Sequence, residues 1–203
     1  MKLVSGGLAK EESAIYVLFG NGPRDRRILG AIAEKMDHRV VLKAPSIPRE
    51  TGLDGLARML RICIERTRVR AYLLAIDIEH LPPTPVKDTL NTVANAFSRY
   101  GLSIQGVETL NSYAHILRVV LGHREARVYL AINGLRSNGI EENLAKLIEI
   151  RYGDAPRTSD VDSWLRKHGK HDRELIEETG IEELEQAFPG IAAALRALKR
   201  GRG

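Results

Sequence analysis

Apolar runs and amphipathic stretches alternate along the first half of the chain. Continuous apolar runs predict strands at 14–19, 39–44 and 70–76. Between these runs, apolar residues recur with the spacing of one helix face, which predicts helices over 24–37 and from Leu53 to Ile64. Strands that are apolar throughout are typical of a parallel sheet with both faces covered, so right-handed βαβ units are expected here.

The pattern changes after Gly101. The segments 103–109, 114–121 and 126–132 have the character of strands, but the links between them are too short to hold helices. Such links predict a meander or an antiparallel edge of the sheet. A helical pattern then returns at Ile140. The whole pattern predicts an α/β fold with an open, mostly parallel sheet, helices on both of its faces and extra antiparallel strands.

A composition rich in Gly, Asp, Pro, Arg, Thr and Ser begins at about residue 153 and is followed by short helical segments. We therefore expect an α/β domain over 1–152 and a helical C-terminal extension over 153–203. A helical piece of this size has too little core to stand alone. Trp164 and Phe188 are expected to dock it onto the sheet domain.

The distribution of charge favours a polyanionic partner. The chain has 31 basic and 26 acidic residues, a formal net charge of +5. All of the excess lies in the first 101 residues, because the second half is balanced. A basic half suits nucleic acid. The alternative is the arginine-rich, ion-paired surface of a heat-adapted protein, which the presence of only two glutamines supports.

The composition also bears on the compartment. The single cysteine, Cys63, excludes an internal disulfide framework and fits a reducing environment. The first residues have no apolar core typical of a secretion signal, and no apolar stretch reaches the length of a membrane span. These features predict a soluble, cytoplasmic protein without a membrane partner.

Two segments follow predicted strands and carry candidate chemistry. In the first, the amides of Gly20 and Gly22 could approach an anion at the start of a helix, with Arg24 as a further phosphate-binding group. In the second, Asp77 and Glu79 could share a hard cation such as Mg²⁺ or Mn²⁺. Ligands of parallel α/β sheets bind at the carboxyl ends of the strands, so both segments are expected at one edge, side by side.

The arrangement resembles Toprim domains, in which a first strand ends in Glu-Gly, an aspartate follows, and a later strand ends in Asp-x-Asp. Here YVLFG at 16–20 followed by Asp25 resembles the first motif, and YLLAIDIE at 72–79 resembles the second. Asn133 with the later Ser-Asn-Gly-Ile-Glu stretch is similar to a segment of overcoming-lysogenization-defect nucleases and their prokaryotic relatives. The resemblance covers roughly 14–150.

The resemblance implies metal-assisted phosphodiester chemistry, with Asp25 or Glu141 completing a site built on the acids at 77 and 79. The second acid could equally be Glu142, and a glutamate three residues after Asn138 has a further explanation as a helix-capping residue. In Toprim enzymes the glutamate before the first glycine is an acid/base or metal ligand. Phe19 stands there and can be neither.

The expected function is therefore that of a divergent, nucleic-acid-associated Toprim-like protein whose phosphodiesterase or nuclease activity is weak or lost. A non-catalytic binding or assembly module is an alternative, as is a small-molecule nucleotide-binding protein. Binding of NAD is disfavoured because the glycine turn lacks a third glycine, whereas Lys43 would tolerate the extra phosphate of NADP.

Overall fold

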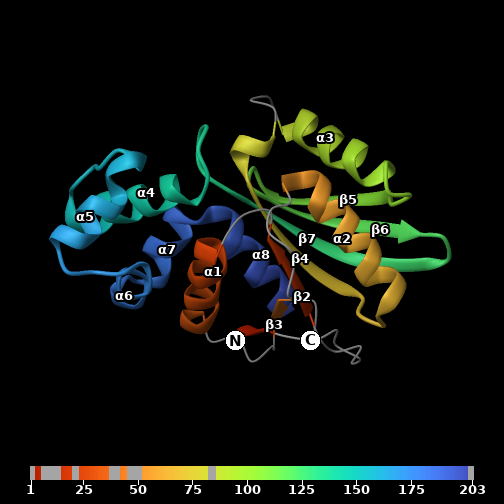
Figure 1. Ribbon diagram of the computed structural model, residues 1–203, viewed down its shortest axis with the longest axis horizontal. Coiled ribbons are helices and arrows are strands. Elements are labelled where there is room, and N and C mark those ends of the chain that lie inside the picture. The colour runs from red at the N-terminus through yellow and green to blue at the C-terminus, as the bar shows by residue number, and fades with distance from the viewer. Residues whose placement is uncertain are drawn as a thin grey trace.

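A computed structural model of the chain describes residues 3–5, 15–19, 23–36, 42–44, 52–81 and 86–200. Figure 1 shows the arrangement of its elements. In chain order these are β1 (Leu3–Ser5), β2 (Ile15–Phe19), α1 (Pro23–Lys35), β3 (Leu42–Ala44), α2 (Gly52–Arg66), β4 (Ala71–Asp77), the 3-10 turn η1 (Ile78–His80), α3 (Val86–Ser98), β5 (Ser103–Asn111), β6 (Ala114–Leu121), β7 (Arg124–Asn133), α4 (Ile140–Tyr152), the 3-10 turn η2 (Thr158–Asp160), α5 (Val161–Lys167), α6 (Asp172–Glu178), α7 (Ile181–Ala187) and α8 (Pro189–Arg200).

The strands form one sheet in the order β1-β3-β2-β4-β7-β6-β5. The first five strands in this order are parallel to one another, whereas β6 pairs antiparallel with β7, and β5 pairs antiparallel with β6. This confirms the predicted open, mostly parallel sheet with antiparallel strands at one side. Strand β1 was not predicted, because three residues in a polar and glycine-containing segment give no periodic signal.

Helices cover both faces of the sheet, as predicted. Side chains along β4 alternate between two apolar clusters: Leu73 and Ala75 pack with α1 and the C-terminal helices, and Tyr72, Leu74 and Ile76 pack with α2 and α3. Figure 1 shows these two groups of helices on opposite sides of the strands. Both faces of β4 are buried, which explains its continuous apolar sequence.

The C-terminal helices share the core of the sheet domain. Helix α8 contacts β7 so closely that a Cβ atom on Gly190 would lie 2.4 Å from the carbonyl oxygen of Ile132. The buried Asn143 side chain donates a hydrogen bond to the Ala187 carbonyl (2.7 Å) and accepts one from the Gly134 amide (2.6 Å). Phe188 is buried in the same core. The loop after β7 is thus fixed by the helices that follow it.

Trp164 contributes at the margin of this core. Its indole N–H donates to Asp154 at 2.7 Å, and its ring stacks on His168 with 4.0 Å between the ring centroids.

None of the helices that the structure describes is both long and apolar enough to cross a membrane.

Candidate acidic site at the carboxyl edge of the sheet

Three acidic side chains come from three elements that meet at the carboxyl edge of the parallel strands. Asp77 is the last residue of β4, which lies between β2 and β7. Asp25 lies in the first turn of α1, the helix that follows β2, and Glu141 lies in the first turn of α4, the helix that follows β7. The βαβ connections bring these ends together, because parallel neighbours end at the same edge.

Asp25 is a buried acid whose pKa is strongly perturbed. The residue is only 3% exposed, and its Oδ2 atom is buried and has no hydrogen-bond partner among the described residues. Burial, and after it the negative charges of Asp77 and Glu141, raise the pKa of Asp25 to about 8, against the smaller opposing effects of its own backbone amide and Arg24. A buried carboxyl group with a raised pKa, coupled to a second carboxylate, is characteristic of a functional site.

Asp77 is also buried, at 3% exposure, and its surroundings are shaped to hold its carboxylate. A Cβ atom on Gly139 would lie 2.5 Å from the carboxyl carbon of Asp77, so a side chain at this position would collide with the acid. Gly139 is the residue before the first turn of α4, and the positive end of this helix favours a negative group. The glycine therefore allows the start of α4 to approach Asp77.

Asn133 ends β7 directly opposite Asp77 in the parallel register. It is 2% exposed, and its Nδ2 atom has no hydrogen-bond partner among the described residues. An amide side chain buried in this way costs about 1–3 kcal/mol if nothing pairs with it. Asn133 is thus a further polar group of the site. Its role was not predicted from the sequence, although a polar residue at the end of an apolar strand is a signal for such a site.

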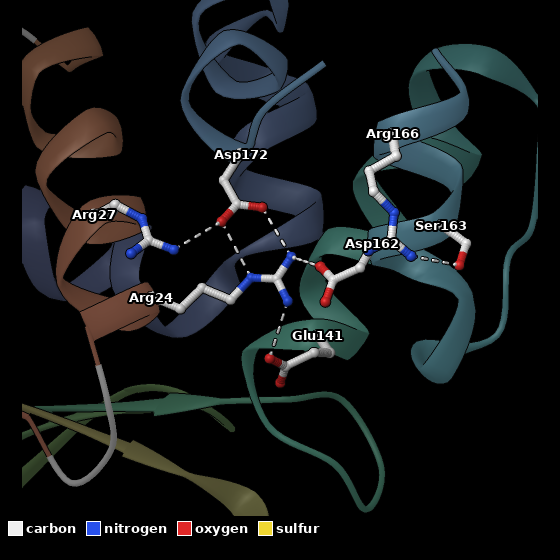
Figure 2. Close-up of polar contacts among 7 residues, drawn as sticks. All are labelled: Arg24, Arg27, Glu141, Asp162, Ser163, Arg166 and Asp172. Carbon is white, nitrogen blue, oxygen red and sulfur yellow. Dashed lines mark hydrogen bonds and ion pairs between the residues drawn. The ribbon is translucent and has the colours of Figure 1, made fainter. Parts of the chain in front are cut away.

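Glu141 is linked to the C-terminal helices through Arg24. The Arg24 guanidinium forms a paired contact with Asp172 (3.1 and 2.8 Å), and it contacts Asp162 at 2.9 Å and Glu141 at 3.3 Å (Figure 2). Arg27 lies 3.7 Å from Asp172. Burial lowers the pKa of Arg24, but hydrogen bonding and the charges of the three carboxylates outweigh this effect and raise it overall. Arg24 was predicted to bind phosphate, and the structure places its guanidinium in contact with three carboxylates.

Glu79 and Glu142 are close in sequence to Asp77 and Glu141, but their contacts are different. Glu79 lies in η1, is exposed, and has its carboxylate 3.7 Å from the His80 ring. Glu142 accepts hydrogen bonds from the backbone amides of residues 135, 136 and 137, which lower its pKa although burial opposes them. Glu142 therefore holds the loop after β7, and Glu141 is the acid that adjoins Asp25. The helix α4 has no side-chain cap from Asn138, because its N-cap is Gly139.

Asp25 and Asp77 are the candidate ligands for a divalent cation. Buried carboxylates, one with an oxygen that lacks a partner, are ligands that Mg²⁺ or Mn²⁺ favours. Asp25 and Asp77 fit this role. Within the described ranges, however, no group of three His, Cys, Asp or Glu side chains is gathered closely enough to hold a metal ion. Gly20 and Gly22 lie outside the described residues, and so does the side chain of Phe19.

No protein-family model matches the chain, and no curated protein or solved structure matches it significantly.

Proposed function

We propose that this protein is a divergent Toprim-like, nucleic-acid-associated protein that binds Mg²⁺ or Mn²⁺ at Asp25 and Asp77, with weak or lost phosphodiester chemistry. The observation that carries the proposal is the electrostatic coupling of Asp25 with Asp77 and Glu141, three acids separated by up to 116 residues of sequence. A cation would relieve the repulsion among them. The order of the motifs, with strand β2 beside β4, supports the family assignment.

The division of roles follows from the contacts of each residue. Asp25 and Asp77 would hold the metal ion, which when bound supplies charge neutralisation to a phosphodiester. Asp25 must lose its proton before it can serve as a ligand, and its raised pKa sets the pH at which this occurs. The amide N–H₂ of Asn133 has no partner among the residues that the structure describes, and it could donate to a phosphate oxygen or a water molecule. Glu141 contributes negative charge while it remains paired with Arg24.

A non-catalytic binding module is the second candidate. The absence of a ready-made three-residue metal group among the residues that can be described favours this candidate. So does Phe19, because phenylalanine cannot transfer a proton or ligate a metal where Toprim enzymes have glutamate. Both candidates use the same edge of the sheet and both allow an inactive wild type, so the cleavage activity of the Phe19→Glu variant separates them.

Cleavage should be weak or absent in the wild-type protein, and Phe19→Glu should increase it. We expect little conversion of supercoiled plasmid to nicked or linear DNA with Mn²⁺ at pH 8, and at least a tenfold faster conversion by the Phe19→Glu variant. The reason is that general acid/base groups contribute about 10²–10⁴-fold to such reactions. Phe19→Gln is the matched control, because it adds a polar side chain of the same length without an acid. Vigorous wild-type cleavage that survives Asp77→Asn would contradict the assignment.

A further inference from the structure

A hollow of about 640 Å³ lies between α1 and the helices α5 and α6, and Arg24 forms part of its wall. This wall is basic. It includes five arginine and lysine side chains and two aspartates, Asp162 and Asp172, so its formal charge is +3 with His171 neutral. The volume is within the range of about 300–1,000 Å³ that is usual for small-molecule sites.

Several of these cations are already engaged by carboxylates. Arg173 pairs with Glu34 and Glu177, and Lys170 pairs with Glu178. Arg24 is held by three carboxylates, as described above. With Arg173 and Lys170 offset by glutamates outside the wall, three arginines and two aspartates leave a formal charge of +1, and Arg27 and Arg166 are the two cations not yet accounted for.

Arg27 and Arg166 have guanidinium groups available to a ligand. The Arg27 side chain is 61% exposed, and its ion pair with Asp172 spans 3.7 Å. Arg166 donates to the Ser163 hydroxyl at 3.2 Å, and no carboxylate of the described chain lies within ion-pair distance of it. Figure 2 shows the two side chains on helices at either side of Asp172 and Asp162, with Arg24 between them.

We propose that this hollow binds a phosphate ester, the group shared by a nucleic-acid strand and a free nucleotide, and that Arg27 and Arg166 hold it. The planar guanidinium fork matches phosphate oxygens and binds them with paired hydrogen bonds. Arg24 contacts both this hollow and Glu141, so a ligand bound here lies beside the acidic site. The link to the acidic site rests on the proposed function, whereas the binding of a phosphate ester does not.

The test is to remove these two charges together and to measure binding in EDTA, so that no metal is involved. Arg27→Ala with Arg166→Ala should weaken binding of a fluorescein-labelled 12-nucleotide single strand at least tenfold at low salt. It should also reduce the slope of log affinity against log salt by about 1.4, since each phosphate contact of a single strand contributes about 0.7. The matched control is Arg58→Ala with Arg68→Ala, which removes the same charge from two other exposed arginines. The control should change affinity less than twofold, and thermal unfolding should show that both variants are folded.

A labelled mononucleotide distinguishes the two sources of the phosphate ester. If the oligonucleotide binds much more tightly and only the Arg27/Arg166 variant loses affinity, the ligand is a strand. If the mononucleotide binds equally well and is lost in the same variant, the ligand is a free nucleotide. The proposal is overturned if the two double variants lose affinity equally, or if the Arg27/Arg166 variant binds both probes as the wild type does. If the wild-type protein binds no Mg²⁺ or Mn²⁺, the proposed function is overturned, but the result of the phosphate-ester binding test in EDTA does not change.

Discussion

Replacing Asp25 by asparagine should stabilise the protein by about 3 kcal/mol at pH 8 and should give no stabilisation at pH 4. The pKa of Asp25 is raised to about 8 in the folded protein, mainly by burial and then by the charges of Asp77 and Glu141. Between about pH 4 and 8 the unfolded chain carries an ionised aspartate while the folded chain keeps the proton. Each pH unit in this window therefore costs folding stability about 1.4 kcal/mol.

Over this pH window the raised pKa of Asp25 lowers the free energy of unfolding by about 5 kcal/mol in total. The Asp25→Asn substitution would recover this stability, but only in part. An asparagine at this position leaves a buried N–H₂ group unpaired, which costs about 1–3 kcal/mol. Urea unfolding at the two pH values measures the difference. The control is Asp88→Asn, an exposed aspartate on α3, which should leave stability within about 0.5 kcal/mol at both pH values. Equal effects of Asp25→Asn at pH 4 and pH 8 would show that the acid is not perturbed.

Arg24→Met should lower the free energy of unfolding by about 2–4 kcal/mol at neutral pH. The Arg24 and Asp172 side chains are 18% and 11% exposed, and the substitution leaves Asp172 half-buried beside Glu141 and Asp162 without the cation that all three contact. Breaking a fully buried pair in this way costs about 3–5 kcal/mol, and partial exposure reduces the penalty. Methionine keeps most of the aliphatic volume, so the charge is the main change.

A second arginine provides the control for this network. Arg99 pairs with Asp54 at 3.1 Å, but both side chains are more than half exposed, so Arg99→Met should cost less than about 1 kcal/mol. Chemical unfolding at neutral pH compares the two variants. If Arg24→Met is as mild as Arg99→Met, the contacts among α1, α4, α5 and α6 do not stabilise the docked extension.

The sequence predicted the parallel half of the fold because its signals were local. The apolar runs before residue 77 contain the parallel strands β2, β3 and β4, of which β4 is buried on both faces, and the short links after Gly101 join the antiparallel strands β5, β6 and β7. The contacts of the C-terminal helices were beyond such reasoning. The close approach of Gly190 to β7 and the bridge made by Asn143 join residues far apart in sequence, and no periodicity reports them.

The candidate site could be predicted only in part for a related reason. Asp25 and Asp77 could be located because each follows a predicted strand of the parallel sheet. The engagement of Arg24 by Asp162 and Asp172 depends on how the C-terminal helices dock, which a spacing argument cannot supply. The choice between Glu141 and Glu142 depends on which side of the first turn of α4 faces Asp25, and two adjacent glutamates leave that open in the sequence.

Titration of the protein with Mn²⁺ in a calorimeter tests the central claim most directly. The wild type should bind one Mn²⁺ with release of a proton, and its affinity should rise with pH up to about 8, because Asp25 must be ionised to act as a ligand. Asp77→Asn should weaken binding at least tenfold, whereas Asp88→Asn should match the wild type. Absence of Mn²⁺ binding at pH 8.5, or binding that is identical in wild type and Asp77→Asn, would contradict the account.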